Sequence, residues 1–97
     1  MERATSIRNE IGPLLDRLIA QLGDEGRATE RAWFARIRRD LNHAHHEPEL
    51  CASMRALYCT PAVGFALSDD AEPLLLRLVE KAERLGAALA DGGALRH

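Results

Sequence analysis

The hydrophobic residues between Asp69 and Leu89 recur at intervals of three and four positions, which places them on one side of an α-helix. Charged residues occupy the opposite side, so the pattern predicts an amphipathic helix over residues 69–89. A short carboxylate at Asp69 or Asp70 is expected to cap its start, and Asp91-Gly92-Gly93 is expected to end it. Other helices must cover its apolar side, whose members are Ala71, Leu74, Leu75, Leu78, Ala82, Leu85 and Leu89.

The same period predicts a first helix from Ser6, as its cap, to about Leu22. Pro13 lies inside this pattern and either kinks the helix or marks its true start. We favour a kinked continuous helix, because the early hydrophobic positions are in phase with the later ones. Gly23 is expected to end this helix. The predicted buried face consists of Ile7, Ile11, Leu14, Leu15, Leu18 and Leu22.

A second helix is expected from Glu25 or Thr29 to His46. Glu47-Pro48 interrupts it, because the residue before a proline avoids helical backbone angles. A shorter third helix then begins at Pro48 and ends near Tyr58. The buried stripe predicted for the second helix is Trp33, Phe34, Ile37, Leu41 and Ala44.

A single helical turn is expected within residues 62–67, and the sequence shows no alternating strand pattern. The pattern therefore predicts an all-α fold. We expect a four-helix antiparallel bundle with a short extra helical turn between helices 3 and 4. The chain of 97 residues is long enough for one domain over 1–97. Residues 1–5 and 92–97 are expected to be loose ends.

Composition narrows the class of protein. No apolar run approaches the roughly 20 residues of a membrane span, and the N-terminal segment lacks the hydrophobic region of a signal peptide. We therefore expect a cytoplasmic protein with no membrane partner. All but one of the 13 basic residues are arginine, a bias that indicates a bacterial genome rich in G and C.

The charge balance argues against nucleic acid as a partner, because 15 acidic residues outnumber 13 basic ones and aromatic residues are few. No phosphate-binding loop or nucleophile motif is present. Whether the chain is an enzyme stays open, although the absence of a catalytic motif favours a non-catalytic role. We expect no cofactor in the primary interpretation.

The densest polar chemistry lies between His43 and Cys51. On a helix, His43 shares a face with His46 and Glu47. Imidazole, carboxylate and thiolate are ligands for zinc and other transition metals. The spacing matches no known metal motif, however, and a solvated helix end explains the same residues. The candidate metal ligands are His43, His46, Glu47 and Cys51.

Two small sets of apolar residues do not fit the buried stripes and form a candidate interaction surface. On the last helix they are Leu76, Val79, Ala87 and Ala90; on the second helix they are Ala28, Ala32 and Ala35. The sequence therefore favours a non-catalytic protein–protein interaction module, expected to be a homodimer and able to bind an unidentified protein partner. The alternative is a small metal- or ligand-sensing bundle that uses the histidine cluster.

Overall fold

The computed structural model describes the backbone of residues 2–94 and the side chains of residues 4–61 and 63–88. The described chain is helical and contains no strand, which confirms the predicted all-α class. None of its helices is sufficiently long and apolar to cross a membrane. The elements are α1 (Glu2–Asp24), α2 (Ala28–His43), α3 (Glu47–Tyr58), the short 3-10 helix η1 (Thr60–Val63) and α4 (Glu72–Ala94).

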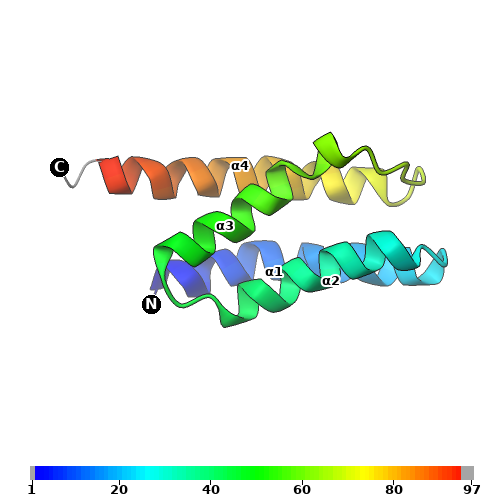
Figure 1. Ribbon diagram of the computed structural model, residues 1–97, viewed down its shortest axis with the longest axis horizontal. Coiled ribbons are helices and arrows are strands. Elements are labelled where there is room, and N and C mark those ends of the chain that lie inside the picture. Colours follow the sequence, from blue (N-terminus) through cyan, green and yellow to red (C-terminus); the bar gives the residue numbers. More distant parts are fainter. Residues whose placement is uncertain (1, 95–97) are drawn as a thin grey trace.

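The helices pack as a bundle in which each has two close neighbours. Both α1 and α3 contact α2 and α4. Figure 1 shows α1 and α2 side by side, with α3 rising obliquely from the end of α2 toward α4. The contacts of α3 with both α2 and α4 place this short helix across one face of the molecule.

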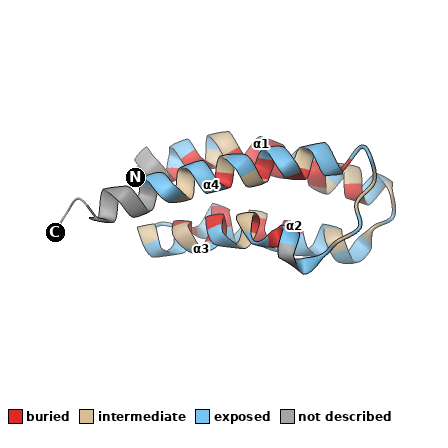
Figure 2. Cartoon of the chain, turned by 90° about the horizontal axis from the view of Figure 1, so that it is seen from above, coloured by how far each residue is buried: buried red, intermediate tan, exposed pale blue. Residues whose placement is uncertain are grey.

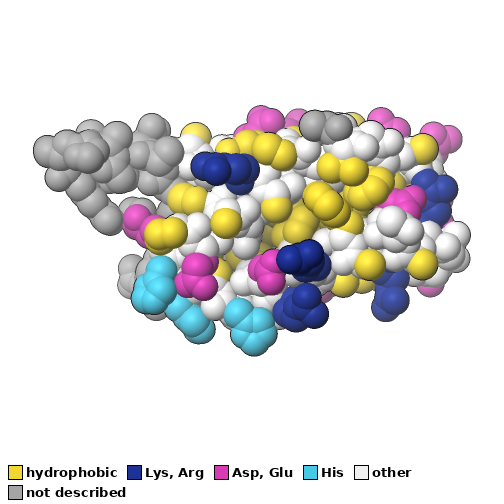
Figure 3. Space-filling model, in the orientation of Figure 1, with side chains coloured by type: hydrophobic (Ala, Val, Ile, Leu, Met, Phe, Trp, Pro, Cys, Tyr) yellow, Lys and Arg dark blue, Asp and Glu magenta, His cyan; other side chains and the backbone are white. Residues whose placement is uncertain are grey.

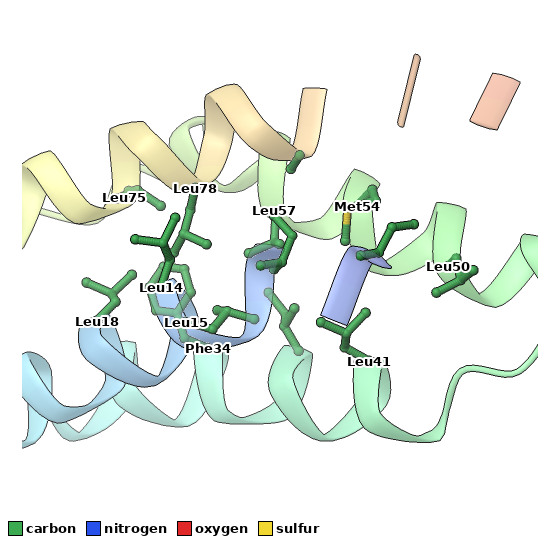
Figure 4. Close-up of a cluster of buried hydrophobic side chains, with 14 of the residues drawn as sticks. Leu14, Leu15, Leu18, Phe34, Leu41, Leu50, Met54, Leu57, Leu75 and Leu78 are labelled. Carbon is green, nitrogen blue, oxygen red and sulfur yellow. The ribbon is translucent and has the colours of Figure 1, made fainter. Parts of the chain in front are cut away.

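The core is built from the periodic hydrophobic positions of all four helices. Buried residues recur along each helix in Figure 2, and Figure 4 shows side chains from the four helices directed toward a common interior. Such buried leucines each stabilise the fold by roughly 1.5–3 kcal/mol relative to exposure. The largest fully buried hydrophobic side chains are Phe34, Ile7, Ile11, Leu15, Leu18, Leu22, Leu41, Leu50, Met54, Leu57 and Leu78.

Helix α1 begins earlier than the sequence pattern predicts. It starts at Glu2, so residues 2–5 are not a loose end and Ser6 is not its cap. Ala4 is buried and lies one turn before Ile7 on the same buried face of α1. The packing of Ala4 therefore stabilises the first turn of the helix. The continuous helix through Pro13 is confirmed.

Other predicted helix boundaries are also wrong: the end of α1, the end of α2 and both ends of α4. Gly26, and not Gly23, follows the end of α1 in the left-handed conformation, with φ of 71°. Helix α2 ends at His43, because Ala44 adopts an extended backbone. The Ser68 hydroxyl, instead of Asp69 or Asp70, accepts the Ala71 N–H at 3.1 Å before α4. Helix α4 continues through Gly92-Gly93, since glycine costs only about 1 kcal/mol inside a helix.

Trp33 does not join the buried stripe predicted for α2. It is 39% exposed, whereas Phe34, Ile37, Leu41 and Ala44 are buried. With 100° between successive residues, Trp33 lies at the edge of the stripe that the other four define. This edge position leaves a large aromatic side chain accessible at the surface.

Candidate functional site

The residues of the predicted metal cluster come from three different segments. His43 ends α2, His46 lies exposed in the connection, and Glu47 begins α3. Cys51 is half-buried on α3 and packs against the hydrophobic core. Figure 3 shows the described histidines at the end of the molecule where α2 meets α3. Among the side chains that the structure describes, no group of three or more His, Cys, Asp or Glu is arranged to hold a metal ion. The metal site stays a prediction to which this arrangement adds no support.

Glu49 has a structural role at the start of α3. Its Oε1 accepts the backbone N–H groups of His45 and His46, both at 3.2 Å. His46 is the residue before the helix, so this is the carboxylate half of a capping box. The bonds from His45 and His46 stabilise the charged form and lower the pKa of Glu49. The connection between α2 and α3 is therefore held in place by a carboxylate on α3.

Arg8 holds the other side of this connection. Its Nε donates to the Leu41 carbonyl at 3.1 Å, and its Nη2 donates to the Ala44 carbonyl at 2.5 Å. Carbonyls at a helix C-terminus lack partners within the helix and carry partial negative charge, so a guanidinium is favoured there. Arg8 thereby fixes the end of α2, including His43, to α1.

A cavity of about 300 Å³ lies between α2 and α3. Its polar lining consists of Asp40 and His43 from α2 and Glu49 and Ser53 from α3. The alanines on α3 leave room because their side chains end at Cβ. The apolar lining is Ile37, Ala52 and Ala56.

A second cavity of about 160 Å³ continues the first toward the other end of α2. It shares Ile37, Asp40 and Ala56 with the larger cavity and adds Trp33 and Arg36. We call the two together the α2–α3 groove. It runs from an acidic, histidine-containing end to an aromatic end.

Trp33 is fixed at the aromatic end of the groove by two contacts. Its ring meets Phe65 edge to face, with centroids 5.7 Å apart. Its Nε1 donates to Thr60 Oγ1 at 3.3 Å, and the buried Thr60 hydroxyl donates to the Ala56 carbonyl at 2.7 Å. An exposed ring in a fixed orientation is suited to contact another molecule, because little side-chain freedom is left to lose.

The predicted interaction surface is placed in part by the structure. Leu76 is 54% exposed and Ala87 is exposed, but Val79 is half-buried and packs against the core. The side chain of Ala90 lies outside the described residues. The alanines of the second set, Ala28, Ala32 and Ala35, are exposed along α2.

Comparison with protein-family models, with curated proteins and with solved structures finds no match to this chain. The candidate site consequently rests on the geometry of the α2–α3 groove. Sequence reasoning missed Asp40 and Ser53, and it placed Trp33 in the core. The spacing of Asp40 and His43, three residues apart on one helix face, was the one available signal for the acidic end.

Proposed function

We propose that the chain is a non-catalytic protein–protein interaction module that forms a homodimer. We also propose that the four helices form an antiparallel bundle, in which η1 is the short extra turn. Thr60 of η1 accepts the hydrogen bond from Trp33 Nε1. The exposed but fixed Trp33 is the observation that carries the homodimer proposal. Tryptophan is enriched among the residues that dominate binding energy at interfaces. Closed two-fold dimers are the commonest assemblies of soluble proteins, so a second copy is the proposed partner.

The proposed contact is the Trp33 surface, defined as Trp33, Val63 and Phe65. Val63 is 48% exposed, and Phe65 supports the indole ring from the side. Figure 3 shows hydrophobic side chains gathered on the face that carries α3 and η1. Leu76 on α4 is the competing contact, since it is 54% exposed and Trp33 is 39% exposed.

Sedimentation velocity of the wild type and two variants tests this proposal. Trp33→Ala is expected to weaken the dimer by at least about 30-fold, because loss of one interface tryptophan costs roughly 2 kcal/mol or more and the variant loses it from both copies. Leu76→Glu is the matched surface variant and is expected to leave the dimer intact. Circular dichroism verifies that both variants stay helical.

A wild type that remains monomeric at high micromolar concentration contradicts the homodimer. A dimer lost in Leu76→Glu but kept in Trp33→Ala moves the interface to α4. Leu76 lies outside the α2–α3 groove, so the result for Leu76→Glu does not depend on whether the groove binds a small ligand.

The alternative of a metal- or ligand-sensing bundle divides into two cases. Calorimetric titration with Zn²⁺ tests whether the histidine cluster binds a transition metal. Binding no tighter than micromolar would reject this metal site. For an organic ligand, the position of His43 on a cavity is a specific favourable observation.

We also propose that the module works in the cytoplasm. Cys51 and Cys59 are both free thiols, and free thiols persist in the reducing environment of that compartment.

A further inference from the structure

The larger cavity of the α2–α3 groove is lined by negative and neutral groups only. Asp40 and Glu49 face it from opposite helices, His43 lies beside them, and no Lys or Arg is in its lining. Asp40 forms no hydrogen bond or ion pair with any other residue of the described chain. The hydrogen bonds to Glu49 both use Oε1, so its Oε2 remains available. This lining is complementary to a cation.

Ser53 provides a separate sign that a polar partner belongs in the cavity. It is only 6% exposed, yet its hydroxyl forms no hydrogen bond with another described residue. The hydroxyl oxygen keeps a small contact with solvent, so its hydrogen-bonding capacity is open toward the cavity that Ser53 lines. Because Ser53 lines the cavity, a donor or acceptor bound there would satisfy it.

The apolar lining indicates what must carry the positive charge. Ile37 and Ala56 continue from the acidic end toward Trp33 and line both cavities. Arg36 borders only the Trp33 end, which disfavours a cationic group there. A ligand with its charge at Asp40 and an apolar stem directed toward Trp33 matches both ends. The volume of about 300 Å³ is at the small end of the range for ligand pockets.

We propose that this cavity binds a primary ammonium group carried on an apolar stem, held by Asp40, Glu49 and Ser53. His43 lines the same cavity, and an imidazole ring nitrogen without a proton can accept a hydrogen bond. The ammonium belongs either to a free alkylamine or to a lysine side chain of another protein. The site meets the proposed homodimer surface at Trp33, which borders the smaller cavity, whereas the groups that hold the ammonium lie outside that surface.

NMR titration of the full chain with n-pentylammonium tests the site, with 1-pentanol as the neutral probe of the same shape. Amide shifts are expected to map to residues lining the cavity, and the amine is expected to bind about tenfold more tightly than the alcohol. Raising the salt concentration should weaken the binding of the amine and leave the binding of the alcohol unchanged. Equal binding of both probes, or shifts elsewhere in the chain, would overturn the proposal.

Charge-neutral variants separate recognition from folding. The double variant Asp40→Asn/Glu49→Gln removes both charges but keeps an acceptor oxygen for the N–H groups at the start of α3. It is expected to weaken the binding of the amine by about tenfold. Ser53→Ala is expected to weaken the binding of the amine by about threefold. Glu83→Gln on α4 is the control, because Glu83 is exposed and outside the cavity, and it is expected to change binding by less than about twofold.

An unchanged affinity in Asp40→Asn/Glu49→Gln, with its circular dichroism spectrum intact, would reject these carboxylates as the recognising groups. A blocked lysine pentapeptide distinguishes the two sources of the ammonium. Tighter binding of the peptide than of the free amine supports a lysine side chain, and the reverse order supports a small molecule. Failure of both probes to bind overturns the site, whereas the mass of the wild type in sedimentation, measured without any probe, still decides on the homodimer.

Discussion

Glu25 joins the two connections at one end of the molecule. Its Oε2 accepts the Ser68 hydroxyl at 2.5 Å and the Gln21 side-chain amide at 2.7 Å. Ser68 in turn receives the N–H of Ala71 at the start of α4. The hydrogen bond from Ser68, followed by that from Gln21, lowers the pKa of Glu25 below its ordinary value of 4.5. The turn after α1 is thereby linked to the entry into α4.

This link predicts a dependence of stability on pH. A carboxylate with a lowered pKa in the folded state stabilises the protein above the ordinary value of 4.5, and that contribution is lost as the pH falls through the lower folded pKa. Urea unfolding of the wild type and of Glu25→Gln measures it. The variant is expected to be less stable at pH 7, with the difference shrinking on acidification below 4.5. A difference that stays constant with pH contradicts this role for Glu25.

At the scale of single residues, the sequence predicted burial well where a residue lies at the centre of a stripe. Phe34 and Leu41 were placed correctly because any rotation of α2 that buries one also buries the other. Trp33 was misplaced because a residue at the edge of a stripe is buried only if a neighbouring element covers it. That outcome depends on Phe65 and Thr60, far away in the sequence.

At the scale of elements, the turn after α1 shows why glycine position matters more than glycine presence. Arg27 N–H donates to the Leu22 carbonyl at 2.9 Å, and Gly26 N–H donates to the Gly23 carbonyl at 3.1 Å. This pair of bonds is a Schellman motif, which requires a left-handed residue at Gly26. The sequence alone offered two glycines three residues apart and gave no means to choose between them.

The two glycines therefore form a matched pair of substitutions. Gly26→Ala is expected to destabilise the fold by about 1 kcal/mol, because a Cβ is strained at a φ of 71°. Gly23→Ala is expected to stabilise it by up to about 1 kcal/mol, because the residue is helical and its new Cβ would meet only the flexible Arg31 side chain. Thermal unfolding of both variants gives the signs. The same sign for both would contradict the assignment of Gly26 as the residue that ends α1.

At the scale of the whole molecule, the sequence predicted the fold class and the helices because each helix carries its own periodic stripe. It could not predict the α2–α3 groove, which depends on how α3 lies against α2. Asp40 and Ser53 line one cavity only once that packing is set. Arg8 contributes to it across 33 residues of sequence by holding the end of α2, and no local pattern reveals such a bond.

In the homodimer that we propose, the second copy binds through the exposed Trp33. Trp33 is the single tryptophan of the sequence, so its fluorescence reports on this surface without labelling. The most direct test records its emission over a dilution series alongside sedimentation. The emission is expected to shift to shorter wavelength as the dimer forms, because the indole ring leaves water, and the midpoint of this shift should match the midpoint of the change in mass. A change in mass without a shift in emission, or no change in mass at all, would contradict it.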